Sequence, residues 1–209
     1  MQIKRAVSVD EILKKKFIEI PFEDHWLKLL GVPEANGVWI IWGLSGNGKS
    51  RFSMMLAREL TKYGKVAYNS LEEGARKSMA KNVRDCKMDA DDVKKNFVIL
   101  DCEPIEELKI RLRKKKHPRF VFIDSFQYTG LNYKQFKQLK EEFRDVLFIF
   151  ISHAEGKLPE GAIAKKVQYD ADIKIRVEGY KAFPMSRMGG GEPYTIWPEQ
   201  AKIYWMDVI

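Results

Sequence analysis

A glycine-rich turn between an apolar run and a helical stretch limits what this chain can fold into more than any other feature. Residues 38–42 are Val-Trp-Ile-Ile-Trp, a run typical of a buried strand, and a helical stretch begins at Lys49. The turn between them fits the pattern G-x-x-x-x-G-K-[ST], with Gly43, Gly48, Lys49 and Ser50 at its fixed positions. A preceding strand and a following helix are the context that this motif requires, so we interpret the turn as a phosphate-binding loop.

Glycines in this turn allow the backbone to hold a phosphate. Without a Cβ atom, successive N–H groups can turn inward around an anion, and the following helix points its positive end at the same place. We expect Lys49 to reach the β- and γ-phosphates of a nucleotide, and the Ser50 hydroxyl to ligate Mg²⁺. The predicted nucleotide-binding residues are Gly43, Ser45, Gly46, Asn47, Gly48, Lys49, Ser50 and Arg51.

The composition indicates a globular protein with one main domain. Of the 209 residues, 45% are hydrophobic and 32% are charged, and no apolar run is long enough to span a bilayer. The first residues lack the apolar stretch of a signal peptide, and Cys86 and Cys102 have no metal-like spacing. We therefore expect a cytoplasmic protein with reduced thiols and no membrane partner. The net charge of +8 favours contacts with polyanions without establishing them.

Strand-like and helix-like stretches alternate along the chain. Apolar runs predict further strands at residues 65–70, 97–100, 120–124, 147–153, 173–177, 194–197 and 202–206. Helical stretches are predicted at residues 50–63, 75–84, 105–116 and 136–144. This alternation predicts an α/β fold with a mostly parallel central sheet flanked by helices, in which the later strands can run antiparallel.

The chain divides into an N-terminal helix with an approach segment, residues 1–36, and a core, residues 37–209. Ser8 and Glu11 have the spacing of a capping box at the start of the N-terminal helix. In the irregular approach segment, Trp26 is expected to cover an edge of the core. The alternative is that its ring stacks on an adenine base.

Polar side chains follow several of the predicted strands. The strand after the first helix is followed by Glu72 and Glu73, and two later strands end at Asp124 and His153. Ligands of a doubly wound sheet bind beyond the carboxyl ends of its strands, so these groups are expected to meet the glycine-rich turn. Asp124 is expected to hold Mg²⁺ there, together with Ser50.

Glu72 and Glu73 compete for one catalytic role. A glutamate at this place can orient the water that attacks the γ-phosphate, or accept its proton. The residues alone leave the choice between the two open, and either one could be only a surface carboxylate. His153 could sense the γ-phosphate by hydrogen bonding, or it could be a histidine satisfied by a neighbouring strand.

These motifs, in this order, resemble those of the RecA-like ATPase superfamily, in particular its RadA, DnaB-helicase and KaiC branches and small RecA-like ATPases of phages and mobile elements. The resemblance covers about residues 31–197, and the matching pieces are residues 43–50, 64–74, 121–127 and 150–153. It implies a RecA-like P-loop fold that binds and hydrolyses ATP with Mg²⁺. The Ser-Leu-Glu of DnaB-type helicases falls on residues 70–72, which assigns the catalytic role to Glu72.

The resemblance also implies a homo-oligomer, a ring or a filament, in which a neighbour completes each site. Residues 186–191, Ser-Arg-Met-Gly-Gly-Gly, resemble the Lys-Asn-Arg-Phe-Gly segment of RadA. Arg187 falls on the arginine that in that family reaches the nucleotide of the neighbouring subunit. The lysine that the family has two residues earlier is Met185 here, and Lys181 is a candidate substitute.

Basic residues in one segment suggest a nucleic-acid partner. In the same family, the segment after the fifth strand often faces DNA, and here it comprises residues 154–169. We expect a mobile loop whose Lys157, Lys165 and Lys166 contact single-stranded DNA. An ordinary exposed loop is the alternative.

Three functions are compatible with these expectations. The first is a Mg²⁺-dependent ATPase that acts as a DNA-associated motor or as a recombination or replication factor, with Glu72, Lys49, His153 and Arg187 as catalytic residues. The second is a non-catalytic, ATP-gated adaptor or assembly switch. The third is a small P-loop kinase, but residues 154–169 lack the arginines that a lid over the phosphates uses. The first function accounts for the most motifs.

Overall fold

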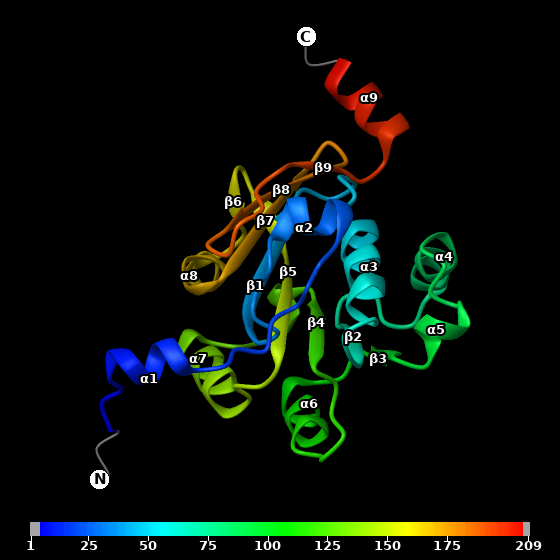
Figure 1. Cartoon of the computed structure of the whole chain (residues 1–209). Helices are drawn as coiled ribbons and strands as arrows, with labels where there is room; N and C mark the ends of the chain where they lie inside the picture. The colour runs from blue at the N-terminus through cyan, green and yellow to red at the C-terminus, as the bar shows by residue number, and fades with distance from the viewer. Residues whose placement is uncertain (1–4, 207–209) are drawn as a thin grey trace.

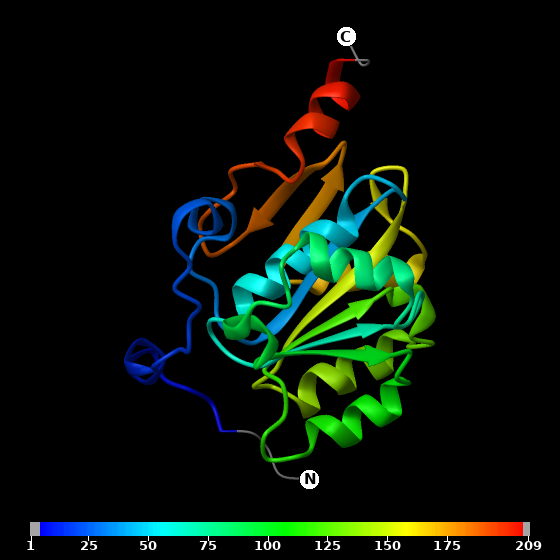
Figure 2. The same ribbon diagram turned by 90° about the vertical axis from the view of Figure 1, so that its right-hand side faces the viewer.

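The computed structural model describes residues 5–206, and within them a nine-stranded sheet is covered by helices on both faces (Figures 1 and 2). The strands are β1 (Gly37–Gly43), β2 (Val66–Ser70), β3 (Phe97–Asp101), β4 (Phe120–Asp124), β5 (Leu147–Glu155), β6 (Leu158–Pro159), β7 (Ile173–Glu178), β8 (Lys181–Ser186) and β9 (Tyr194–Thr195). The helices are α1 (Val9–Lys14), α2 (Asp24–Leu30), α3 (Lys49–Leu60), α4 (Lys77–Asp85), α5 (Asp91–Lys94), α6 (Ile105–Leu112), η1 (Phe126–Tyr128), α7 (Tyr133–Glu142), α8 (Ala162–Asp170) and α9 (Pro198–Met206).

The strand order places the glycine-rich turn inside the sheet. From one edge to the other, the strands lie in the order β3-β2-β4-β5-β1-β7-β8-β9, and β6 pairs with β5. The strands from β3 to β7 in this order are parallel, whereas β6, β8 and β9 are antiparallel to their partners. This confirms the predicted α/β fold with its mostly parallel sheet and antiparallel later strands. Strand β1 pairs with β5 on one side and β7 on the other.

Strand β1 separates two core clusters, because its side chains alternate between the two faces of the sheet. Trp39 and Ile41 pack into the first cluster, with apolar residues of α2, α3, α4 and α5. Ile40 and Trp42 pack into the second cluster, with apolar residues of α6, α7 and α8. Burial of each such side chain stabilises the fold by about 1.5–3 kcal/mol. Burial on both faces explains why the strand is apolar throughout instead of alternating with polar residues.

Some elements differ from the sequence-based expectation. The predicted strand at residues 202–206 is wrong, since these residues belong to α9. Pro198 begins that helix and Glu199 lies in its first turn, and both favour a helix start over a strand. The sequence does not predict β8, because Pro184 lies within it and proline is rare inside a sheet. Helix α2 is also missed, since its apolar stretch is only seven residues long.

The expected mobile loop at residues 154–169 is wrong. Strand β5 continues to Glu155, the chain returns as β6, and α8 follows directly. Ala164 and Val167, three residues apart on α8, are buried in the second core cluster. This short apolar pair anchors the helix, but it is too brief to stand out as a helical stripe among the lysines.

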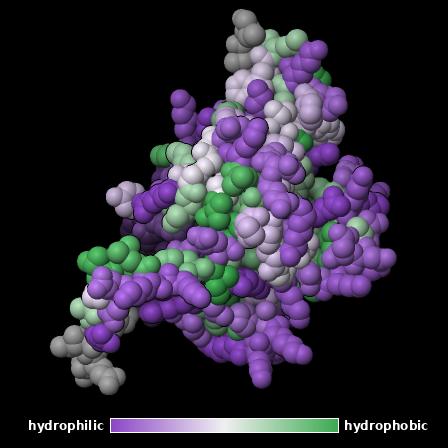
Figure 3. All heavy atoms as spheres, viewed as in Figure 1, coloured by the Kyte–Doolittle hydropathy of each residue, from purple (hydrophilic) through white to green (hydrophobic). Residues whose placement is uncertain are grey.

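Helix α1 stands apart from the sheet and exposes apolar side chains. Its expected capping box is present: Glu11 N donates to Ser8 Oγ at 3.2 Å, and Ser8 N donates to Glu11 Oε2 at 2.8 Å. None of its residues is buried, and Val9 and Leu13 are 73% and 79% exposed. Figure 3 shows this apolar surface at the left of the molecule. Neither α1 nor another helix in residues 5–206 has the length and apolar character needed to cross a membrane.

Candidate nucleotide-binding site

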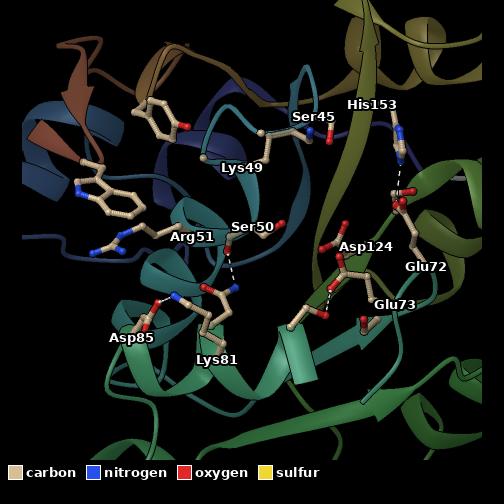
Figure 4. Close-up of a pocket in the computed structure, with 18 residues that line it drawn as sticks. Ser45, Lys49, Ser50, Arg51, Glu72, Glu73, Lys81, Asp85, Asp124 and His153 are labelled. Atoms are coloured by element: carbon tan, nitrogen blue, oxygen red, sulfur yellow. Dashed lines mark hydrogen bonds and ion pairs between the residues drawn. The ribbon is translucent and has the colours of Figure 1, made fainter. Parts of the chain in front are cut away.

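A cavity of about 400 Å³ lies beyond the carboxyl ends of the parallel strands (Figure 4). Its walls come from the glycine-rich turn after β1, the residues that follow β2, and the ends of β4 and β5. The predicted site residues that line it are Ser45, Gly46, Gly48, Lys49, Ser50, Arg51, Glu72, Asp124 and His153, together with Glu73. The structure thus brings together side chains from four separate strand ends.

Two glycines of the turn are required by the backbone. A Cβ atom added to Gly43 would lie 2.1 Å from the carbonyl oxygen of Val177 on β7, so no side chain fits there. Gly48 has a φ of +97°, which favours glycine, and α3 begins directly after it. The turn therefore leads into the N-terminus of α3 at the cavity wall, where free N–H groups and the helix dipole favour a phosphate.

Asn47 ties the turn to the hairpin between β7 and β8. Its Oδ1 accepts a hydrogen bond of 2.7 Å from the Gly179 N–H, and its carbonyl oxygen accepts one of 3.1 Å from the Tyr180 N–H. Trp205 of α9 in turn donates from Nε1 to the Gly179 carbonyl at 3.0 Å. Of the predicted nucleotide-binding residues, Gly43 and Asn47 do not line the cavity, and their contacts hold the turn in place.

The ammonium group of Lys49 is held by the turn itself. Its Nζ donates a hydrogen bond of 3.0 Å to the Leu44 carbonyl. Burial lowers the pKa of Lys49, and the carboxylates of Asp124 and Glu72 oppose that shift. A phosphate would compete with the Leu44 carbonyl for this cation, because a charged acceptor forms the stronger hydrogen bond.

Asp124, at the end of β4, has a partner that the sequence does not predict. The buried hydroxyl of Tyr68 on β2 donates a hydrogen bond of 2.7 Å to Asp124 Oδ2. Burial raises the pKa of Asp124 to about 6, and the bond from Tyr68 partly offsets this rise. The signal for the contact was a tyrosine in a fully buried strand, since a buried phenol usually finds a hydrogen-bond partner.

The oxygen atoms near Asp124 suit Mg²⁺. Ser50 and Asp124 both line the cavity and offer a hydroxyl and a carboxylate, the hard oxygen donors that this cation prefers. The Oγ of Ser125, the next residue along the chain, is buried and has no hydrogen-bond partner among the described residues. It is therefore available to a bound polar group. The residues present fit the cation.

Glu72 and Glu73 are held in different ways. Glu72 Oε2 lies 2.9 Å from His153 Nε2, and both side chains are 35% exposed at the cavity (Figure 4). Glu73 Oε2 accepts a hydrogen bond of 2.8 Å from the Ser78 hydroxyl on α4. Glu72 is thus oriented by another cavity residue from a different strand, whereas Glu73 is attached to a helix at the rim.

Gln127 fixes the strand end that carries His153. Its Nε2 donates to Ser152 Oγ at 2.8 Å and to the Glu160 carbonyl at 3.1 Å, and its Oε1 accepts from the His153 N–H at 3.3 Å. The amide therefore joins the exit of β4, the end of β5 and the segment before α8. The sequence motif contained Gln127, but these contacts depend on the pairing of β4 with β5.

An aromatic group at the cavity was not predicted. Tyr180 and Trp197 both line it, with ring centres 6.1 Å apart and planes at 80°. The guanidinium of Arg51 lies 4.6 Å from the centre of the Trp197 ring. Ring faces and a stacked guanidinium are surfaces on which a nucleobase can pack. Neither aromatic residue belongs to a sequence motif, because the β7–β8 hairpin and the segment before α9 bring them to the turn.

Two solved structures share this architecture. One is the ATPase domain of a helicase, with a TM-score of 0.54 and 17% identity, where the match covers 80% of this chain and 84% of that one. The other is the KaiC-like protein PH0186 from the hyperthermophilic archaeon Pyrococcus horikoshii OT3, with a TM-score of 0.55 and 19% identity over 78% of this chain and 85% of that one. The fold is RecA-like. Comparisons with family models and with curated proteins gave no match.

Arg187 lies away from the cavity of this RecA-like core. It follows Ser186, which pairs with Ile173 at the start of β7, and Ile173 pairs with Trp39 near the start of β1. The glycine-rich turn leaves the other end of β1, several residues away at about 3.3 Å each. The exposed Arg187 therefore does not reach the turn of its own chain. Lys181 begins β8 at the opposite end from Arg187, so it does not replace the missing lysine beside it.

The three lysines predicted to contact DNA are also outside the cavity. Lys165 Nζ forms an ion pair of 2.8 Å with Glu155 Oε2. Lys166 Nζ lies 5.4 Å from the centre of the Tyr133 ring. Lys157 lies between β5 and β6, and its carbonyl accepts a hydrogen bond of 3.1 Å from Trp42 Nε1. Two of the three cations are therefore already engaged within the chain.

We expect the replacement Asp124→Asn to stabilise the protein in the absence of nucleotide at neutral pH. Between its ordinary value of 3.8 and the folded-state pKa of about 6, the folded chain binds more protons at Asp124 than the unfolded chain does. Wild-type stability therefore falls as the pH rises through that window, by up to about 3 kcal/mol. Asparagine can still accept the hydrogen bond from Tyr68 and carries no charge.

Urea unfolding at several pH values tests this expectation. The difference between Asp124→Asn and wild type should be largest above pH 6 and should shrink toward pH 4, with exposed Asp89→Asn as the matched control. A difference that grows as the pH falls would contradict it.

Proposed function

We propose that the protein is a Mg²⁺-dependent ATPase of RecA-like type that forms a homo-oligomer and acts on single-stranded DNA, as a motor or as a recombination or replication factor. The observation that carries the proposal is the convergence of Lys49, Glu72, Asp124 and His153 on one cavity from four strand ends (Figure 4). These are a cation, a candidate base, a metal ligand and a hydrogen-bonding group, which is the set that phosphoryl transfer needs.

Nucleotide binding uses the turn and the start of α3. The N–H groups of residues 46–50 surround the β-phosphate, and Lys49 moves from the Leu44 carbonyl to the β- and γ-phosphates. Ser50 and Asp124 hold Mg²⁺, which supplies neutralisation of the phosphate charge when it is bound. The base packs against Tyr180 and Trp197 beside Arg51.

Hydrolysis uses Glu72 as the group that directs water. The oxygen of a water molecule attacks the γ-phosphorus, the bond from this phosphorus to the β–γ bridging oxygen breaks, and Glu72 accepts the proton of the water. The contact with His153 keeps the Glu72 carboxylate at the cavity. Glu73 is the weaker candidate because its carboxylate is bound to Ser78 on the rim helix.

Two features support an assembly of identical subunits. Arg187 is exposed at the end of the sheet opposite its own turn, where it is available to the nucleotide of a neighbour. Helix α1 exposes Val9, Ile12 and Leu13, which a second copy of the chain could cover. Nucleic-acid contact through Lys157, Lys165 and Lys166 is part of the proposal, with Lys157 the least engaged of the three.

Phosphate release and particle size together test the proposal. With ATP and Mg²⁺, we expect turnover, a larger particle and stimulation by single-stranded DNA. Lys49→Ala should lose all three, because it removes the phosphate-binding cation. Assembly that depends on ATP but proceeds without turnover would instead indicate an ATP-gated adaptor. Absence of nucleotide binding would overturn the proposal.

A further inference from the structure

A second hollow, of about 230 Å³, lies at the end of the sheet opposite the nucleotide cavity. It is formed where β2 and β3 begin and where the chain leaves α6 toward β4. Val66, Val98 and Pro118 provide its apolar surface. Its cationic residues are Lys65, Lys95, Arg111, Lys114 and Lys116, and no aspartate or glutamate of the described residues lines it. We call it the basic groove; Figures 1 and 3 show the strongly hydrophilic surface around α6 where it lies.

Four of these cations have no acidic partner in the part of the chain that the structure describes. Arg111 is neutralised by Glu103, with Nε–Oε1 at 3.0 Å and Nη2–Oε2 at 2.5 Å. Among the residues described, no ion pair involves Lys65, Lys95, Lys114 or Lys116. Lysines just outside the groove differ, since Lys94 pairs with Asp91 at 2.5 Å. The groove thus concentrates positive charge that residues 5–206 do not compensate.

Uncompensated charge of this kind favours a bound anion. Like charges around one hollow repel each other, and an anion between them replaces repulsion by attraction. Lysine binds phosphate as a point charge, whereas planar carboxylates are better matched by the guanidinium of arginine. The single arginine of the groove is already occupied by Glu103. The donors that remain therefore suit phosphate better than the side chains of an acidic peptide.

The size of the groove favours a single strand. A hollow of about 230 Å³ accepts a phosphate with its sugar on the apolar surface, but it is too small to admit a duplex. We propose that the basic groove binds the phosphodiester backbone of a single-stranded nucleic acid. This rests on the nucleic-acid association in the proposed function, but it assigns the contact to another face than Lys157, Lys165 and Lys166. It does not depend on ATP hydrolysis.

Two double variants with equal charge change test the groove. Lys95→Gln/Lys116→Gln removes two groove cations, and Lys94→Gln/Lys115→Gln removes the adjacent lysines that do not line it. Binding of a fluorescein-labelled oligothymidylate is followed by anisotropy over a range of salt concentrations. We expect the groove variant to bind on the order of tenfold more weakly in about 0.1 M salt, with a log–log salt slope smaller by about 1.4. The adjacent-lysine variant should bind as wild type does.

Other outcomes separate this proposal from the one on which it rests. Equal weakening in both double variants would show a general charge effect and would overturn the groove. Loss confined to Lys157→Gln/Lys165→Gln would also overturn it, while leaving the nucleic-acid part of the proposed function standing. Failure of wild type to bind at low salt would overturn both. Displacement of the oligonucleotide by poly-glutamate as readily as by unlabelled oligothymidylate would assign the groove to acidic peptides and overturn the proposal. Unchanged ATP turnover without nucleic acid shows that the groove variant is folded.

Discussion

Replacing Glu72 by glutamine is expected to lower ATP turnover by about 10²- to 10⁴-fold while ATP remains bound. Glutamine keeps the size of the side chain and an oxygen that can accept from His153, which lies 2.9 Å from Glu72 Oε2. It cannot accept the proton of the attacking water, so the loss falls on the chemical step. Single-turnover phosphate release and nucleotide binding, measured separately, distinguish the two effects.

Glu73→Gln is the matched control for this change. Its carboxylate accepts from Ser78 and is directed to α4, so we expect turnover close to that of wild type. A larger loss in Glu73→Gln than in Glu72→Gln would transfer the catalytic role to Glu73. Equal and small losses in both variants would argue against hydrolysis directed by either carboxylate.

Arg187→Ala is expected to reduce turnover by about 10³- to 10⁵-fold, the range for an arginine that acts on the nucleotide of a neighbour. Because Arg187 lies at the end of the sheet opposite the turn of its own chain, ATP binding to each subunit should persist. The variant should therefore assemble with bound ATP but hydrolyse it very slowly. Arg144→Ala, an exposed arginine elsewhere on the surface, should behave as wild type does.

Mixing two inactive variants tests whether Arg187 acts between subunits. In a mixed assembly, a Lys49→Ala subunit has no functional cavity but still presents Arg187 to its neighbour. An Arg187→Ala subunit beside it has an intact cavity, so turnover should return on mixing. If the two variants co-assemble and remain inactive, Arg187 does not complete a neighbouring site.

The convergence of the site could be predicted because parallel strands end at the same edge of a sheet. Each polar group in question, from Glu72 to His153, directly follows an apolar run, and the strand order then determines that they meet. Local signals were also enough for the capping box of Ser8 and Glu11, since both of its hydrogen bonds lie within one turn. Contacts of this kind need no knowledge of distant residues.

Contacts made by the later part of the chain could not be predicted in this way. Tyr180 and Trp197 reach the cavity only because β8 runs antiparallel to β7 and α9 packs on their hairpin. Pro184 conceals that strand, and the lysines around Val167 conceal α8. The engagement of Lys165 by Glu155 likewise depends on how the chain folds back after β5. Pairing across long separations decides each of these cases.

The position of β1 between β5 and β7 has a consequence for synthesis of the protein. Gly37–Gly43 is the first strand that leaves the ribosome, yet both of its partners are made much later. During that interval its apolar side chains, two tryptophans among them, cannot be buried by the pairing seen in the finished sheet. A nascent chain in this state is prone to aggregate or to be captured by chaperones. Competence to bind a nucleotide thus arises late, after the segments that brace the glycine-rich turn have been translated.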